Sequence, residues 1–349
     1  MKSSPSTDRV RLLIASPLER RWVERIAAAR PDRVDVIHAP DLLPTPRYRN
    51  DHGGRPAELD EGRRRRWRDL LAKADILFDF DWEDPAHLPQ RAPRLRWVQA
   101  TSAGIGEFVR GYGLSDSSIR FTTAAGVHAQ PLAEFVAMAL LYFAKDVPAL
   151  KEWQRRHHWE RYCGRELAGS SALLIGLGGV GCRVAEMCAS LGVHVIGHRR
   201  TAGGVVPASV RRLISSAEID ETLPLVDYVI IAAPHTAETD LLIDAHRLTL
   251  FPDTCVLINV GRGRIVDERA LIQALRDGRV RGAALDVFER EPLPADSPLW
   301  DMPNVLISPH SASTVERENE RIVGILIDNL HRFLDGQPLI NEYDHDRQY

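Results

Sequence analysis

The strongest constraint on the fold is a glycine-rich turn that directly follows an apolar run near the middle of the chain. Helix-like and strand-like segments follow it at residues 183–190 and 194–197. In such a strand–turn–helix, Gly176 permits the tight turn, Gly178 lets the backbone approach a pyrophosphate, and Gly181 allows close helix–strand packing. The helix N-terminus offers free N–H groups to the phosphates. A lone GxGxxG also occurs in ordinary turns, but here both strands and the helix are present. We expect pyrophosphate contacts from Gly176, Gly178, Gly179, Val180 and Gly181.

Strand-like and helix-like segments alternate on both sides of this turn. Apolar runs occur before it at residues 10–15, 34–37, 76–78 and 97–99, and after it at 228–232, 255–259, 283–287 and 305–307. Alternating strands and helices are typical of parallel sheets with right-handed crossovers. We therefore expect an α/β protein with two doubly wound parallel-sheet domains.

Three further segments have distinct patterns. Residues 131–143 are almost entirely apolar at helical spacing, which indicates a long buried helix. Apolar residues between Ile322 and Phe333 also follow helical spacing, with Gly336 as the stop. Residues 40–54 contain Pro, Arg and Gly without a period. We expect an exposed connection there, although a role of residues 45–54 in selecting substrates is an alternative.

The tip of the second strand bears on the choice of dinucleotide. An acid at this place would bind the ribose 2′-hydroxyl of NAD. The sequence instead has Arg199, Arg200 and Thr201, with no Asp or Glu before Glu218. Two guanidiniums and a hydroxyl suit a 2′-phosphate. The sequence therefore favours NADP, and NAD stays possible if the arginines are merely solvated.

Composition limits the partners and the compartment. The net charge of −3 gives no reason to expect nucleic acid or an anionic membrane as partner, and the run of arginines at 63–66 is flanked by acids, as on a solvated helix face. No Cys or His spacing typical of metal ligands occurs. The four cysteines form no CxxC pair, which fits a reducing cytoplasm. The polar N-terminus is unlike a secretory signal, and no apolar run is long enough to cross a bilayer. We expect a cytoplasmic protein without a metal.

Three polar residues each follow an apolar strand of the second series. They are Arg262, Glu291 and His310. Ligands of open α/β sheets gather at the carboxyl edge, where these residues should lie. Taken singly, the histidine could be a packed strand-end residue, the arginine a turn cap and the glutamate a solvated surface group.

Five motifs that occur in order resemble those of the D-isomer-specific 2-hydroxyacid dehydrogenases. The resemblance covers residues 97 to the C-terminus, including a linker-like Ala125-Gly126-Val127, and is only general before residue 97. One departure is Gly104-Ile105-Gly106, where the family often has an Asp. The motifs are the GxGxxG turn, Ala233-Pro234-His-Thr236-Ala-Glu-Thr239, Asn259-x-x-Arg262-Gly263, Asp286-Val-Phe-Glu-x-Glu291-Pro292 and Pro309-His310.

The resemblance implies roles for these residues. Arg262 would hold the substrate carboxylate, with backbone N–H groups of Ser102, Ala103 and Gly104 on its other side. His310 would exchange a proton with the substrate oxygen, and Glu291 would orient the imidazole and raise its pKa. Further cofactor contacts would come from Ala233, Pro234, Val260, Gly261, Asp286, Ser311 and Ala312.

The resemblance also implies an architecture and a reaction. A Rossmann domain at residues 127–311 would be inserted in a flavodoxin-like substrate domain formed by residues 1–126 and 312–349, in a homodimer. The activity would be hydride transfer between NAD(P)H and a 2-keto or D-2-hydroxy acid, with glyoxylate or hydroxypyruvate as first guesses. A non-enzymatic NAD(P)-binding sensor of the same fold is the alternative, although none of the three site residues is lost.

Overall fold

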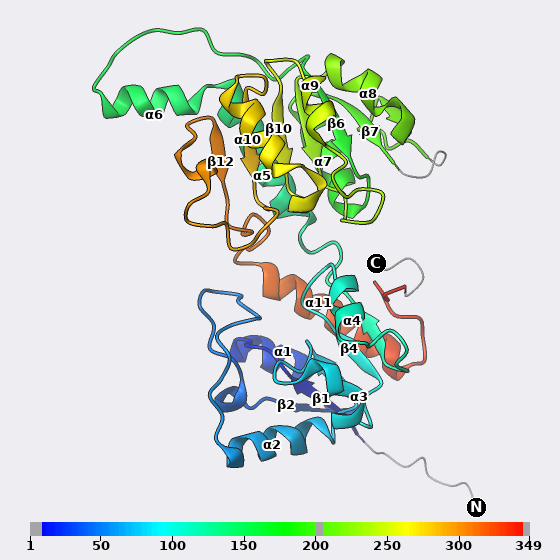
Figure 1. The fold of residues 1–349 in the computed structure, drawn as a ribbon. Helices are drawn as coiled ribbons and strands as arrows, with labels where there is room; N and C mark the ends of the chain where they lie inside the picture. Colours follow the sequence, from blue (N-terminus) through cyan, green and yellow to red (C-terminus); the bar gives the residue numbers. More distant parts are fainter. Residues whose placement is uncertain (1–8, 200–204, 345–349) are drawn as a thin grey trace, which may run out of the picture. The chain divides into compact units, whose positions relative to one another are not determined.

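The computed structural model describes residues 9–199 and 205–344, which form two compact units. The first unit contains residues 9–128 and 314–344, and the second contains the described residues from 129 to 313. The second unit is therefore inserted in sequence between the two parts of the first (Figure 1). The boundaries expected from the sequence lay at 126/127 and 311/312.

The first unit is built on a five-stranded parallel sheet with the order β2-β1-β3-β4-β5. Alternate residues of each strand face opposite sides, and both sides are buried. Leu12 and Ile14 pack on the side of α1 and α11, whereas Leu13 packs on the side of α2. The strands are β1 (Val10–Ile14), β2 (Val34–Ile37), β3 (Ile76–Phe78), β4 (Trp97–Gln99) and β5 (Arg120–Thr122). The helices are α1 (Arg20–Ala29), α2 (Glu61–Leu71), α3 (Leu88–Arg91), α4 (Gly106–Gly111) and α11 (Glu318–Leu334).

The second unit is built on a seven-stranded parallel sheet with the order β12-β11-β10-β9-β6-β7-β8. Helices α5 and α7 cover one face, and α9 and α10 cover the other. The strands are β6 (Ser171–Ile175), β7 (His194–His198), β8 (Arg212–Ile214), β9 (Tyr228–Ile231), β10 (Val256–Asn259), β11 (Gly282–Leu285) and β12 (Val305–Ile307). The helices are α5 (Ala129–Ala144), α6 (Val147–Arg155), α7 (Gly179–Ser190), α8 (Ile219–Thr222), α9 (Ala245–Thr249) and α10 (Glu268–Arg276). The two parallel sheets confirm the expected fold class.

Helix α5 is buried along one face only. Val136, Leu140 and Phe143 lie in the core, but Met138 and Leu141 keep 44% and 41% of their surface exposed. Within the single chain the expected long helix is therefore buried on one face and partly exposed on the other. The apolar residues of its outer face are not covered by the described part of this chain.

The segment 40–54 is the largely exposed connection that its composition suggested, but parts of it are anchored in the core. Leu42 and Leu43 are buried in the core of the first unit, and the backbone of Thr45 pairs with that of Arg55. Asp51 is 2% exposed and accepts hydrogen bonds from Arg47 and from the Gly54 N–H. Leucine burial and the satisfied carboxylate anchor the segment, whereas residues 45–49 are exposed as the sequence indicated.

Among the described helices, none combines the length and apolar character that a membrane crossing needs. The arginines at 63–66 lie exposed along α2, where Arg66 pairs with Asp41 and Arg64 with Glu83. This is the solvated helix face that the sequence indicated.

Candidate active site

The glycine-rich turn joins β6 to α7 in a geometry that only glycines allow. Gly176 has a φ of +96°, and a Cβ on it would lie 2.7 Å from the backbone of Ala233. A Cβ on Gly181 would lie 1.8 Å from the carbonyl oxygen of Gly176. A Cβ on Gly178 would meet nothing within 4 Å. The backbone is therefore tightly packed at Gly176 and Gly181, whereas there is free space beside Gly178 at the start of α7. This free space fits a bound pyrophosphate.

The tip of β7 presents no free carboxylate among its described residues. His198 is 6% exposed, and its Nε2 lies 3.0 Å from Ser216 Oγ. Glu218, the first acid after the strand, accepts bonds from the Ser215 N–H and from Arg212, which hold its pKa at about 2. Arg199 is partly exposed, whereas Arg200 and Thr201 lie outside the described residues.

His310 and Glu291 are in direct contact in the second unit. His310 Nδ1 lies 2.7 Å from Glu291 Oε2, and the Phe288 N–H donates to Glu291 Oε1 at 3.0 Å. The bond to Glu291 raises the pKa of His310 and outweighs burial, which lowers it. Burial pushes the pKa of Glu291 up, but its bonds to His310 and Phe288 leave it below the usual value. The pair is an imidazolium–carboxylate arrangement suited to proton transfer.

Asp286 supports the loop that carries His310. Its carboxylate is 2% exposed, and Oδ1 accepts from the Ser308 hydroxyl at 2.6 Å and from the Ser311 and Ala312 N–H groups at 2.9 Å. The His310 N–H also donates to the Asp286 carbonyl, and His310 has a φ of +52°. Because that conformation is unfavourable for histidine, these bonds help to hold the imidazole in place.

Arg262 lies at the same sheet edge, after β10. Its guanidinium is exposed, Nη1 donates to the Gly261 carbonyl at 2.8 Å, and its charge lowers the pKa values of Glu291 and His310 as a minor contribution. Buried Asn259 fixes the turn by donating to the Arg262 carbonyl and accepting from the Gly261 N–H. Sequence reasoning did not assign Asn259 a role; its signal is a polar residue that ends an apolar strand.

Gly263 brings the loops after β10 and β11 together. A Cβ on Gly263 would lie 1.9 Å from the carbonyl group of Phe288, so any side chain would push the two loops apart. Phe288 in turn binds Glu291. The backbone contact therefore links the loop of Arg262 to the loop of the His310 partner.

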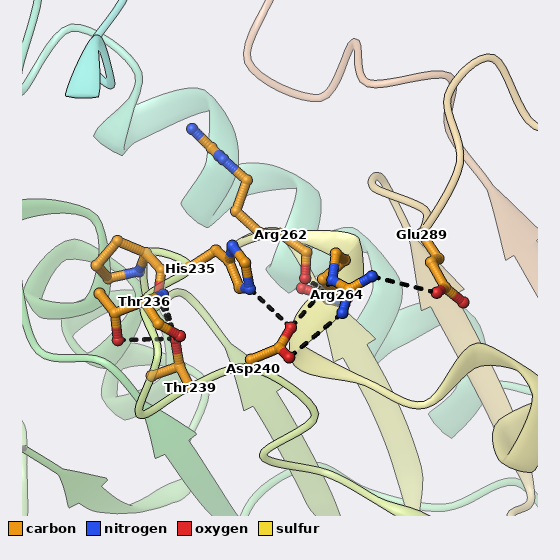
Figure 2. Close-up of polar contacts among 9 residues, drawn as sticks. His235, Thr236, Thr239, Asp240, Arg262, Arg264 and Glu289 are labelled. Atoms are coloured by element: carbon orange, nitrogen blue, oxygen red, sulfur yellow. Dashed lines mark hydrogen bonds and ion pairs between the residues drawn. The ribbon is translucent and has the colours of Figure 1, made fainter. Parts of the chain in front are cut away.

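A polar network beside Arg262 was not expected from the sequence. Asp240 accepts from Arg264 Nε at 3.0 Å and lies 2.8 Å from His235 Nε2, and Arg264 also pairs with Glu289 (Figure 2). In Figure 2 the side chain of Arg262 points away from Asp240, whereas that of Arg264 turns toward it. The network ties the segment after β9 to the loop after β10 and leaves Arg262 outside it.

Two turns that were expected to bind ligand are formed as well. After β9, Thr239 Oγ1 donates to the Pro234 carbonyl at 2.8 Å and accepts from the Thr236 N–H, which shapes the backbone beside Ala233. Ser102, Ala103 and Gly104 form an exposed turn after β4, in the first unit. Arg262, Glu291 and His310 all belong to the second unit.

The described residues contain no group of His, Cys, Asp and Glu able to hold a metal.

Comparisons with known proteins agree with this geometry. The sequence model of the D-isomer specific 2-hydroxyacid dehydrogenase NAD binding domain matches residues 137–312. A glyoxylate reductase from Aeropyrum pernix is 34% identical over 72% of this chain and 76% of its own. Glyoxylate/hydroxypyruvate reductase B from Pectobacterium atrosepticum is 32% identical over 71% and 78%.

Solved structures share the whole architecture. A D-isomer specific 2-hydroxyacid dehydrogenase family protein from Aeromonas salmonicida matches 97% of this chain and 100% of its own, with a TM-score of 0.80 and 28% identity. An NADPH-dependent glyoxylate/hydroxypyruvate reductase from Sinorhizobium meliloti, in complex with NADP and sulfate, has a TM-score of 0.77 and 26% identity over 98% and 100%. The chain therefore belongs to the D-isomer specific 2-hydroxyacid dehydrogenase family and is an NAD(P)-dependent oxidoreductase.

Proposed function

We propose that this chain reduces a 2-keto acid to the D-2-hydroxy acid with His310 as the proton donor, and catalyses the reverse oxidation with His310 as the acceptor. The observation that carries this proposal is the 2.7 Å contact between His310 Nδ1 and Glu291 Oε2. It holds the imidazole, favours its charged form and leaves Nε2 as the nitrogen that faces substrate.

The protons and electrons balance in this scheme. The nicotinamide, when bound, supplies the hydride to the carbonyl carbon. Protonated His310 transfers its Nε2 proton to the carbonyl oxygen, which becomes the hydroxyl, and the neutral imidazole remains bonded to Glu291. Arg262 holds the substrate carboxylate with its planar guanidinium, and the N–H groups of Ser102, Ala103 and Gly104 provide further donors.

The cofactor in this proposal is NADP, with NAD also accepted. The open start of α7 takes the pyrophosphate, and Arg199, Arg200 and Thr201 bind the 2′-phosphate. The NADP complex of the Sinorhizobium meliloti relative supports this choice. The remaining contacts are assigned to Gly176, Gly178, Gly179, Val180, Gly181, Ala233, Pro234, Val260, Gly261, Asp286, Ser311 and Ala312.

The domains and assembly follow the same proposal. The first unit binds substrate and the second binds the dinucleotide. The exposed Met138 and Leu141 of α5 support a homodimer in which a second copy covers that face. Buried, unpaired Cys188 and Cys255 fit a reducing cytoplasm.

Absorbance-detected oxidation of NADPH against a panel of 2-keto acids, with NADH in parallel, tests the proposal. Glyoxylate and hydroxypyruvate come first because curated relatives carry those names. Turnover of any 2-keto acid, with a lower KM for NADPH, is the expected result. Tight cofactor binding without turnover of any acid would overturn the assigned reaction.

A further inference from the structure

A large hollow opens at the carboxyl edge of the five-stranded sheet in the first unit. Its volume is about 690 Å³, within the range of small-molecule sites. The ends of β1, β3 and β4 and the start of α4 line it, and Ser102 and Gly104 lie in its wall. The proposed carboxylate-binding turn therefore faces a space far larger than a two-carbon acid requires.

Asp79 is the acid of this hollow that lacks an ion-pair partner. It follows β3 with a φ of +70°, and its Oδ2 accepts from the Thr101 hydroxyl at 2.9 Å. Within the described chain no cationic group lies at ion-pair distance from it. Burial raises its pKa, an effect that the His52 imidazole opposes only in part. A half-buried carboxylate without an ion-pair partner gains free energy when a ligand brings a positive charge to it.

The other acids in the wall already have partners. Asp81 pairs with Arg91 at 2.9 Å, Glu83 with Arg64 at 3.3 Å, and Asp84 with His87 at 2.9 Å. Glu83 also contacts Arg91. Each of these acids therefore has a basic side chain at ion-pair distance, whereas Asp79 has none among the described residues.

No lysine or arginine stands among the described residues that line the hollow. Its histidine, His52, is held through both ring nitrogens, with Nδ1 3.0 Å from Ser16 Oγ and Nε2 2.8 Å from the Asn319 amide oxygen. An anionic substrate group would find no lysine or arginine here to replace its hydration. Such a group is disfavoured beside Asp79.

Aromatic side chains supply the rest of a cation site. Phe80, Phe108 and Tyr112 line the hollow, and their rings contact one another in sequence at a tilt, with centroids 4.3 Å and 4.6 Å apart. Trp82 lies in the same wall. Aromatic faces beside a carboxylate attract ammonium and guanidinium groups, particularly where water is partly excluded.

From these contacts we infer that the hollow selects 2-keto acids whose side chain ends in a cation, which Asp79 binds. This inference rests on the proposed 2-keto acid reduction and names its substrate class. The keto-acid end lies at Ser102 and Gly104, and the cationic end reaches Asp79 among the aromatic rings. Glyoxylate and hydroxypyruvate leave this contact unused.

Calorimetric binding to the full chain, with and without NADP⁺, tests the inference without requiring turnover. The probes are 5-guanidino-2-oxopentanoate, the anionic 2-oxoglutarate and the neutral 2-oxohexanoate. The guanidino acid should bind at least about tenfold more tightly than either of the others. Equal affinities for the cationic and anionic probes would overturn the inference.

Asp79→Asn isolates the charge, because asparagine also tolerates a positive φ. This variant should bind the guanidino acid about as weakly as wild type binds 2-oxohexanoate, with 2-oxohexanoate itself unchanged. Asp146→Asn is the control, since Asp146 also has a positive φ, +50°, and lies in the other unit. An Asp79→Asn protein that keeps the wild-type preference would exclude Asp79 as the anchor.

Binding and turnover together separate the two proposals. Selective binding of the guanidino acid without its reduction would support the cation site and contradict the proposed reductase reaction. Reduction of all three acids with equal kcat/KM would support the reductase reaction and contradict the cation site. Loss of every activity in Asp79→Asn, with an unchanged thermal midpoint, would show a role in the reaction instead of in selection.

Discussion

His310 Nδ1 lies 2.7 Å from Glu291 Oε2, and the pKa values of the two groups are displaced in opposite directions. A raised histidine pKa stabilises the fold below the unfolded value of 6.5, and this contribution is lost as pH rises through the folded pKa. A lowered glutamate pKa stabilises the fold above 4.5, and that contribution is lost as pH falls through the folded pKa. The pair therefore stabilises the fold most between about pH 4.5 and 6.5.

Glu291→Gln should move the alkaline limb of reduction to lower pH. The variant removes the charge that raises the His310 pKa, so the imidazolium is lost earlier as pH rises. The profile of kcat/KM against pH measures the shift. Glu289→Gln is the control, because Glu289 pairs with Arg264 instead. Identical limbs in wild type and Glu291→Gln would rule out this role for Glu291.

His310→Ala should leave the fold intact and remove nearly all turnover. The His310 side chain is 49% exposed, so its loss leaves little cavity, whereas general acid–base catalysis contributes roughly a hundredfold or more. The readouts are kcat and the thermal midpoint. His246→Ala, at an exposed histidine of α9, should change neither. The proposal fails if His310→Ala retains more than about a tenth of the wild-type kcat.

Asp286→Ala should destabilise the loop that carries His310. The Ser311 and Ala312 N–H groups would lose their acceptor, at a cost of about 1–3 kcal/mol for each group that stays buried and unpaired. The free energy of unfolding in urea measures this loss. Asp286→Asn retains an amide oxygen as acceptor and should recover part of it. Equal stability of wild type and Asp286→Ala would show that these bonds do not hold the loop.

Two glycine variants should separate packing from phosphate binding. In Gly181→Ala the new Cβ meets the Gly176 carbonyl, so both the thermal midpoint and NADPH binding should fall. Gly178→Ala has free space for its Cβ, so the midpoint should hold while NADPH binding weakens by about tenfold. NADPH fluorescence and thermal melts give the two readouts. Unimpaired NADPH binding by Gly178→Ala would place the pyrophosphate elsewhere.

Arg199→Ala should raise the KM for NADPH more than that for NADH. Removal of a guanidinium weakens binding of the 2′-phosphate, which NADH lacks. The ratio of kcat/KM values for the two cofactors measures the effect. Arg211→Ala, at an exposed arginine just before β8, is the matched control. A parallel loss with both cofactors would remove Arg199 from 2′-phosphate recognition.

Local sequence alone was sufficient to predict the central strands and the glycine-rich turn. The strand-like segments at 76–78 and 97–99 coincide with β3 and β4, whose residues other than Gln99 are apolar because both faces of the sheet are buried. The glycine-rich turn could be predicted as well, since a Cβ at Gly176 or Gly181 would clash with the backbone and only glycine fits there. The short strands β5 (Arg120–Thr122) and β8 (Arg212–Ile214) were missed, because three residues beginning with arginine carry too little pattern.

Tertiary structure decided what each polar side chain contacts. The motifs identified Asp286 as a site residue, but only the packed loop shows Oδ1 bonded to Ser308, Ser311 and Ala312. No local pattern distinguishes Asp79, which has no ion-pair partner among the described residues, from Asp81, which pairs with Arg91. Sequence determines which groups can bear charge and where strands end. The partners of those charges come from segments far apart in the chain, so burial and pairing follow only from the fold.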